Sequence, residues 1–286
     1  MIWFVRGRGL AGTMLNVLLR AENLVVRHHP ALPPVLDGVS LDVAAGEFVA
    51  VVGGNGSGKS TLARSLCGLL PLESGRVTDA TGTAQPRVGL VLQDPAAQFV
   101  AGTVADDIAF GPEGAGAEPE RIAATVTGLV RMLDLETVAA SDPSRISGGQ
   151  QQRSAIAAVL ACDVDVLILD EPTAMLDGAA CAELVSHMPL LVGGRGVVWV
   201  TQAADELALC HRVVLLDAGV VIWSGLTTEY VARPEIAATV GLELPVASRI
   251  AHAMAARGEW LQAWPIPVSE TELLTTLGVL GGAHGA

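Results

Sequence analysis

Short runs of apolar residues alternate with amphipathic segments along most of the chain. Continuous apolar runs predict buried strands, and alternating β-branched patterns predict further strands nearer the N-terminus. The predicted strands cover residues 18–27, 39–43, 48–52, 87–93, 166–169, 197–201, 213–216 and 220–223. The predicted helices cover residues 60–69, 118–135, 150–161 and 179–188. Strands that alternate with helices predict an α/β fold, in which helices cover both faces of a parallel sheet.

The same pattern predicts how the chain is organised. Residues 18–230 carry the alternation of strands and helices, with a mostly helical insertion at about residues 94–163. In the helix predicted at residues 118–135, five apolar residues share one face, as an amphipathic helix requires. They are Ile122, Val126, Leu129, Val130 and Leu133. After Tyr230, prolines interrupt a helical pattern, which predicts a small C-terminal helical domain at residues 231–286.

The chain is rich in apolar residues, but it lacks the pattern of a membrane span or a signal peptide. Apolar residues make up 51% of the sequence and the mean hydropathy is +0.49. No stretch reaches the roughly 18 uninterrupted apolar residues that a span requires. Residues 1–17 are interrupted by Arg6 and Arg8, so we expect a disordered lead-in, with Met14 as good a start as Met1. The apolar content therefore fits a chain that buries surface against partners.

Charge and cysteine content exclude some classes of function. The chain has 17 basic and 30 acidic residues and a net charge of −13, which argues against nucleic acid as a partner. A bound nucleotide needs only a local anion site. The cysteines are widely spaced, with no CxxC pair, which predicts reduced, partly buried thiols in the cytosol. They are Cys67, Cys162, Cys181 and Cys210.

A glycine-rich loop follows the strand predicted at residues 48–52. It reads GGNGSGKST over residues 53–61 and leads into a helix, which is the setting of a phosphate-binding loop. Its glycines let backbone N–H groups face the phosphates, and the helix adds its positive N-terminal dipole. Lys59 would reach the β- and γ-phosphates, and the Ser60 hydroxyl would bind Mg²⁺. The expected contacts are Gly53, Asn55, Gly56, Ser57, Gly58, Lys59, Ser60 and Thr61.

Two adjacent acids end the apolar strand predicted at residues 166–169. Asp170 would hold Mg²⁺ through water, and Glu171 would orient and deprotonate the attacking water as a general base. Such a pair is often only a solvated acidic turn. After a phosphate-binding loop, however, the pair indicates nucleotide hydrolysis.

Ser147, Gly148, Gly149 and Gln150 form a third motif, SGGQ, at the start of a predicted helix. Together with the phosphate loop and the acid pair, it resembles the signature of the ATP-binding cassette (ABC) family. Ile146 replaces the leucine usual before the serine. The resemblance implies a P-loop NTPase fold with a helical subdomain. It also implies that two cassettes sandwich two ATP molecules, with Ser147, Gly149 and Gln150 contacting the ATP of the other cassette. A serine that caps a helix N-terminus suits an anion.

The resemblance assigns further residues and also exposes two departures. Gln93 matches the glutamine that senses Mg²⁺ and the attacking water, and Asp177 matches the loop that communicates across the dimer. Where the family has a histidine after the strand at residues 197–201, this chain has Gln202, an amide that can donate to the γ-phosphate but cannot become a cation. In place of the usual aromatic on adenine, the chain offers His28, whose imidazole can stack.

Three stretches are similar to the ATPases of energy-coupling factor (ECF) transporters, which import vitamins and cobalt or nickel ions. They are residues 93–98 with the second glutamine Gln98, residues 103–113, and short C-terminal motifs at residues 241–245, 257–258 and 269–274. The resemblance implies ATP as cofactor with Mg²⁺, a second cassette, a membrane coupling subunit and a separate substrate-capture membrane subunit. It implies a peripheral place at the cytoplasmic face of the membrane, docking at about residues 93–110, and dimerisation through the tail.

Two other functions remain open at this point. Gln202 motivates a slowly hydrolysing cassette that acts as a regulatory, ATP-dependent clamp in a heterodimer. A cassette protein of DNA repair or translation is the third possibility, and the acidic balance and the absence of a long coiled coil weigh against it. Substrate identity lies in another chain, and the sequence does not say whether the partner cassette is a copy or a paralogue.

Overall fold

The computed structural model describes residues 16–283, whose central element is a six-stranded sheet in the order β5-β6-β7-β3-β8-β9. All neighbouring strands are parallel except β8 and β9. The strands are β3 (Phe48–Val52), β5 (Val88–Val91), β6 (Val166–Asp170), β7 (Gly196–Val200), β8 (Arg212–Asp217) and β9 (Val220–Leu226). Every residue of β3, β6 and β7 is buried, as expected for apolar strands covered on both faces. The predicted parallel sheet is confirmed.

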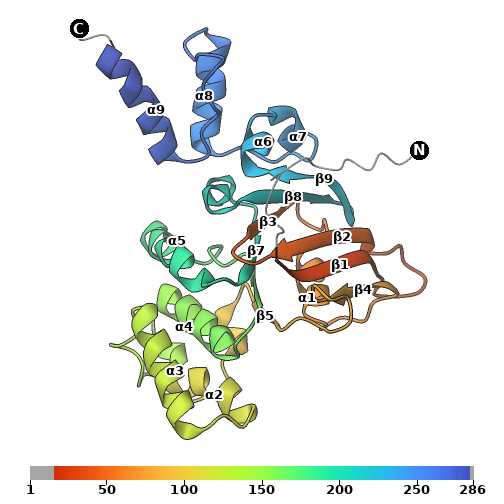
Figure 1. The fold of residues 1–286 in the computed structure, drawn as a ribbon, viewed down its shortest axis with the longest axis vertical. Coiled ribbons are helices and arrows are strands. Elements are labelled where there is room, and N and C mark those ends of the chain that lie inside the picture. The colour runs from red at the N-terminus through yellow and green to blue at the C-terminus, as the bar shows by residue number, and fades with distance from the viewer. Residues whose placement is uncertain (1–15, 284–286) are drawn as a thin grey trace.

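A second, three-stranded antiparallel sheet lies beside the first, in the order β2-β1-β4 (Figure 1). It comprises β1 (Val17–Val26), β2 (Leu36–Ala44) and β4 (Ser74–Thr78). Leu19, Leu24 and Leu36 from this sheet are fully buried and pack in one core cluster with α1 (Lys59–Leu66) and one face of the main sheet. The sequence pattern did not predict β4, because its residues, SGRVT, show no apolar alternation.

The helical insertion forms one end of the molecule (Figure 1). It contains α2 (Val104–Gly114), α3 (Pro119–Met132), α4 (Gly148–Ala161) and the short 3₁₀ helices η1 (Pro95–Gln98) and η2 (Pro143–Arg145). In the apolar face predicted for residues 118–135, which form α3, Val130 and Leu133 are buried and the other members are half-buried. The amphipathic face therefore packs inward as its periodicity indicates. The helix ends three residues earlier than predicted, at Met132.

The chain after β7 returns to the sheet and then leaves it. Helix α5 (Gly178–Val192) precedes β7. The elements after β7, apart from β8 and β9, are η3 (Ala204–Leu209), α6 (Thr227–Val231), α7 (Pro234–Ala238), α8 (Val246–Ala256) and α9 (Glu270–Ala283). Tyr230, Val231, Ala237 and Leu244 belong to the main core. A separate small cluster joins α8 and α9, which project from the body (Figure 1). It consists of Ala247, Ala251, Trp260 and Leu273.

Two expectations about the chain's surroundings can be compared with the structure. In the part of the chain that is described, no helix is long and apolar enough to cross a membrane. The lead-in predicted for residues 1–17 lies mostly outside the described residues, although Val17 already opens β1. The four cysteines are free thiols, as predicted, and only Cys210 is buried while Cys162 is exposed.

Candidate functional site

The phosphate loop connects the central strand β3 to α1 through backbone conformations that require glycine. Gly56 and Gly58 have φ values of 77° and 105°, in the left-handed region that residues with a Cβ rarely adopt. A Cβ on Gly53 would lie 2.2 Å from the carbonyl oxygen of Leu216, so no larger residue fits there. The loop therefore has room to wrap around a ligand only because these positions are glycine.

Lys59, the first residue of α1, folds back over this loop. Its Nζ donates to the carbonyl oxygens of Gly53 and Gly54, both at 2.9 Å, and the residue is only 6% exposed. Burial lowers the pKa of Lys59, while the nearby Glu171 and Asp170 charges raise it. An ammonium has three N–H donors, so two hold the loop in shape and one remains for an anionic ligand.

Ser60 and Asp170 form an oxygen pair beside the lysine. Ser60 Oγ donates to Asp170 Oδ1 at 3.2 Å, and Asp170 is only 3% exposed at the carboxyl end of β6. Burial raises the pKa of Asp170, whereas the hydrogen bond from Ser60 lowers it. A hydroxyl and a carboxylate on adjacent elements are hard oxygen donors of the kind that Mg²⁺ prefers. The residues present therefore fit this cation.

Glu171 lies between two glutamine amides. Its Oε2 accepts from Gln93 Nε2 at 3.1 Å, and its Oε1 accepts from Gln202 Nε2 at 2.7 Å. The same Gln202 amide donates to Asn55 Oδ1 in the phosphate loop at 2.9 Å. Glu171 itself has a φ of 48°, and its N–H bonds to the carbonyl oxygen of Val200 at 2.9 Å. A non-glycine residue in this region of φ is uncommon and indicates a conformation held by its surroundings.

Sheet order explains why residues so far apart in sequence meet here. Gln93, Glu171 and Gln202 each follow one of three adjacent parallel strands, β5, β6 and β7, and the phosphate loop follows β3 next to them. The carboxyl ends of parallel strands share one edge of a sheet, where α/β proteins bind ligands. Sequence reasoning named all three residues but missed the bonds of Gln202 to Glu171 and Asn55, since these depend on side-chain directions.

A cavity of about 340 Å³ opens at this edge. It is lined by Val35, Asn55, Gly56, Gly58, Lys59, Ser60, Thr61, Gln93 and Glu171. It therefore brings together six of the eight predicted loop contacts with Gln93 and Glu171. Gly53 and Ser57 belong to the loop but do not line the cavity, because Gly53 packs against Leu216 and Ser57. Ser57 Oγ is buried without a hydrogen-bond partner among the described residues.

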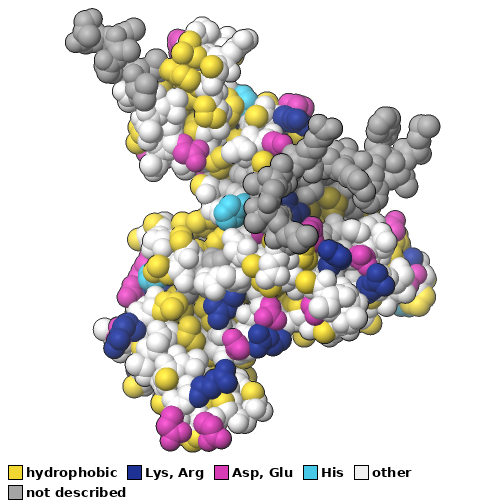
Figure 2. All heavy atoms as spheres, in the orientation of Figure 1, with side chains coloured by type: hydrophobic (Ala, Val, Ile, Leu, Met, Phe, Trp, Pro, Cys, Tyr) yellow, Lys and Arg dark blue, Asp and Glu magenta, His cyan; other side chains and the backbone are white. Residues whose placement is uncertain are grey.

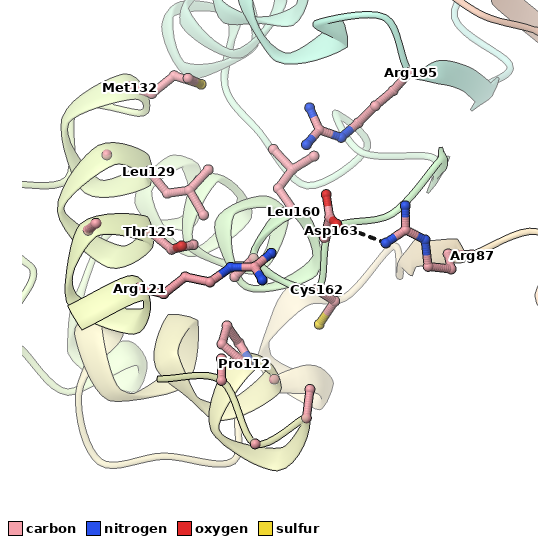
Figure 3. Close-up of a pocket in the computed structure, with 17 residues that line it drawn as sticks. Arg87, Pro112, Arg121, Thr125, Leu129, Met132, Leu160, Cys162, Asp163 and Arg195 are labelled. Carbon is pink, nitrogen blue, oxygen red and sulfur yellow. Dashed lines mark hydrogen bonds and ion pairs between the residues drawn. The ribbon is translucent and has the colours of Figure 1, made fainter. Parts of the chain in front are cut away.

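A larger cavity of about 750 Å³ lies elsewhere, between α2, α3 and the end of α4 (Figure 3). Arg87, Arg121 and Arg195 reach it, and Arg87 pairs with Asp163 at 2.8 Å. Arg87 and Arg195 precede β5 and β7, whereas Gln93 and Gln202 follow those strands. This cavity is therefore at the opposite edge of the sheet from the phosphate loop and is not the nucleotide site.

The signature residues form the exposed start of α4. Ser147 Oγ accepts from the Gln150 N–H at 3.3 Å, and the Gln150 side chain accepts from the Ser147 N–H at 3.0 Å. This reciprocal capping box leaves the helix N-terminus ordered and open to solvent, with Ser147 and Gly148 exposed. Gly149 is buried, and a Cβ there would approach Ala180 Cβ to 2.9 Å, so the close packing against α5 requires glycine. None of the signature residues lines the cavity at the phosphate loop.

Two predicted contacts are not brought to that cavity within this chain. Asp177 caps α5, where its Oδ1 accepts from the Ala180 N–H at 2.9 Å. His28 is exposed in the turn after β1 and is not among the residues that line the cavity. Its stacking on adenine stays a prediction.

Gln98 has a role that the sequence pattern did not show. Its Oε1 accepts from the Leu92 N–H at 2.7 Å, and its Nε2 donates to the Leu90 carbonyl oxygen at 2.9 Å. The amide thus pairs with the free edge of β5 as a neighbouring strand would. It holds the end of β5 from which Gln93 projects.

Comparison with known proteins agrees with this site. The family model described as ABC transporter matches residues 36–174. The energy-coupling factor transporter ATP-binding protein EcfA1 of Lacticaseibacillus paracasei is 38% identical, covering 84% of this chain and 90% of the relative. EcfA1 of Symbiobacterium thermophilum is 42% identical, covering 78% of this chain and 82% of the relative.

A solved structure supports the same assignment. It is that of CbiO1 from Clostridium perfringens, described as part of the ABC transporter complex CbiONQ. Its TM-score is 0.69 at 30% sequence identity, and the match covers 84% of this chain and 99% of that one.

The fold and the site define an ATP-binding cassette, with its phosphate loop, acid pair and signature helix. Within that class the chain belongs to the ATP-binding proteins of energy-coupling factor transporters. It is an ATPase subunit whose hydrolysis of ATP energises an importer.

Proposed function

We propose that this chain hydrolyses MgATP with Glu171 as general base, and that Gln93 and Gln202 hold its carboxylate in place. The observation that carries the proposal is the double hydrogen bond to Glu171, one amide on each oxygen. A carboxylate fixed in this way keeps one orientation toward a water placed at the γ-phosphate. Lys59 binds the phosphates with its remaining N–H donor, and the loop N–H groups surround them.

Ser60 and Asp170 would hold Mg²⁺, with Gln93 close by. When bound, the cation neutralises charge on the phosphates. Ser60 contributes a hydroxyl that is already within 3.2 Å of Asp170 Oδ1, so the pair needs little rearrangement. Gln93, bonded to Glu171, would link the metal side of the site to the base.

Gln202 favours a second candidate, a slow regulatory cassette. Its neutral amide occupies the place where a cation would compensate transition-state charge. Both N–H donors of this amide are engaged, one with Asn55 and one with Glu171. Turnover of the assembled transporter separates the two functions. If Glu171→Gln abolishes turnover, this site hydrolyses ATP. If turnover persists and a distinct second cassette is present, this site is the slow one.

We infer that a second cassette completes the nucleotide site. Ser147 and Gly148 are exposed at a helix N-terminus suited to an anion, yet they do not line this chain's own cavity. A partner cassette would present its equivalent residues there. His28, Gly149, Gln150 and Asp177 keep the roles that the family resemblance gives them.

The helices α8 and α9 are the proposed dimerisation element. Val246, Ile250 and Leu274 are 48%, 42% and 59% exposed, and they border a cavity of about 630 Å³ that these two helices form with η3. Figure 2 shows hydrophobic side chains gathered on the surface of this projecting part. An apolar face outside the main core is typical of an interface.

The membrane subunit would dock beside Gln93, the glutamine that follows β5. Val100 and Phe110 are 65% and 58% exposed, large apolar side chains in the stretch where docking was predicted. A membrane coupling subunit seated there would place the chain at the cytoplasmic face of the membrane. Co-purification from membranes tests this: Phe110→Asp should release the chain from its membrane partner while ATP binding persists.

A further inference from the structure

Glu206 is a buried acid that none of the proposed steps uses. It lies in η3, four residues after Gln202, and is only 7% exposed. Its Oε2 accepts from the indole Nε1 of Trp199 at 2.6 Å, and its Oε1 accepts from the hydroxyl of Thr173. Within residues 16–283 no basic side chain forms an ion pair with it.

A carboxylate buried without a cation is expensive for the folded state. Neutral donors offset only part of the desolvation, and apolar residues of similar size often stabilise a protein as well or better. Burial raises the pKa values of the neighbouring thiols Cys181 and Cys210, and the nearby charge of Glu206 raises them further. Stability alone therefore gives a poor account of this residue.

The two bonds of Glu206 connect the elements that surround Glu171. Trp199 is fully buried in β7, where it pairs with Ala50 of β3 on one side and Leu169 of β6 on the other. Thr173 lies two residues after Glu171, in the loop that leaves β6. Glu206 thus anchors η3 both to the centre of the sheet and to the loop of the proposed base.

Two hydrogen bonds join the segment after β7 to the segment after β6. Gln202 bonds to Glu171, and Glu206 bonds to Thr173. Between them, the hydroxyl of Thr201 accepts from the Ala203 N–H at 2.9 Å, which stiffens the turn into η3. A shift of η3 would therefore move the Gln202 amide relative to the Glu171 carboxylate. Lys59 bonds to the carbonyl oxygens of Gly53 and Gly54, and Ser60 bonds to Asp170, so both would keep their places.

We propose that Glu206 is a positioning residue for ATP hydrolysis. It acts through Thr173 and η3 to hold the Glu171 carboxylate and the Gln202 amide in their relative positions. The inference rests on the proposed function, because it needs Glu171 as the base. Its loss should lower kcat and leave MgATP binding intact, since the phosphate loop does not depend on it. A misplacement of about 1 Å can cost roughly a hundredfold in rate, so a tenfold effect is a modest expectation.

The experiment compares four variants in the assembled transporter, each measured for kcat and for MgATP affinity. Thr173→Val removes one hydroxyl and keeps the shape, and Glu206→Leu removes the acid. Glu206→Gln can still accept from Trp199 and donate to Thr173. Thr227→Val is the matched control: its buried hydroxyl donates at 2.5 Å to the carbonyl oxygen of Cys210, the residue after η3, rather than to Glu206 or to the loop of Glu171.

We expect Thr173→Val to lower kcat about tenfold, with MgATP affinity within about twofold, and Glu206→Gln to stay near wild type. Thr227→Val should lower the melting temperature and leave kcat unchanged below it. Wild-type kcat in Thr173→Val, an equal loss in Thr227→Val, or a parallel loss of MgATP affinity would each overturn the proposal. Should Glu206→Leu not fold, Thr173→Val decides the question. Activity that survives in Glu171→Gln would instead refute the proposed function.

Discussion

Removing the amide of Gln202 tests how much the geometry around Glu171 contributes to catalysis. Gln202→Ala deletes two hydrogen bonds, at 2.7 Å to Glu171 Oε1 and 2.9 Å to Asn55 Oδ1. The fold should persist, because Gln202 is exposed and follows β7 rather than packing in the core. The change therefore acts on the site and not on the stability of the sheet.

The size of the effect follows from the nature of the two bonds. A hydrogen bond to a charged group contributes about 1.5–3 kcal/mol, and one between neutral groups about 1 kcal/mol. Because Gln202 is exposed, water replaces part of each, so we take the lower end for the bond to Glu171. About 1.4 kcal/mol corresponds to a factor of ten, so kcat should fall about tenfold. MgATP affinity should change little, since Lys59 and Ser60 stay in place.

The assay is phosphate release by the assembled transporter, with a separate MgATP binding titration. Gln202→His is the informative companion variant. A neutral imidazole donates from only one nitrogen, but a protonated one adds a charge near the γ-phosphate. We expect turnover equal to or above that of the wild type. Wild-type turnover in Gln202→Ala would refute the reasoning. A marked loss of turnover in Gln202→His would show that the site depends on an amide that donates to two acceptors at once.

Three further predictions concern other parts of the chain. Lys59→Ala should weaken MgATP binding at least about tenfold, because a charge-assisted contact with the phosphates is lost; unchanged affinity in a titration would contradict the phosphate-loop assignment. Deleting residues 246–286 should weaken pairing of the cassettes, as light scattering would show, and should leave the main core folded because it removes only Val268 from the buried members of that cluster; intact pairing would rule out a dimerisation role for α8 and α9. Cys67 should resist alkylation at pH 8 while the exposed Cys162 reacts, because burial raises the pKa of Cys67 to about 12 and the thiolate forms only as pH approaches that value; mass spectrometry that finds Cys67 labelled first would contradict this.

Contiguous motifs were the most predictable part of this site. The phosphate loop and the acid pair each lie within a few residues, so their chemistry could be deduced from spacing and from the adjoining strands. Gln93, Glu171 and Gln202 could be placed at one edge because each follows a predicted strand of a parallel sheet. The structure brings these residues together as that reasoning required.

Features that depend on side-chain direction could not be deduced in the same way. Gln98 has an ordinary loop position in the sequence, and only the fold shows that it pairs with the edge of β5. Glu206 lies on a short helix whose orientation is set by Trp199 and Thr173, one of them 33 residues away. β4 has no apolar alternation and is a strand only because β1 pairs with it.

The tail illustrates a similar limit. The sequence pattern changes from strands and helices to proline-interrupted helices at Tyr230. The ring centroids of Tyr230 and Trp223 nevertheless lie 5.4 Å apart in the main core, where α6 and α7 also pack. Proline spacing shows where helices stop, but it does not show which core they join. The separately packed part begins only with α8.

The central claim is that Glu171 is the base with which this cassette hydrolyses ATP. Its most direct test is to load the assembled transporter with labelled MgATP, remove the excess, and identify the nucleotide that stays bound. We predict that the wild type converts its ATP to ADP and phosphate, while Glu171→Gln binds with similar affinity and retains intact ATP. Conversion of bound ATP by Glu171→Gln at the wild-type rate, with no second cassette type in the complex, would contradict the account.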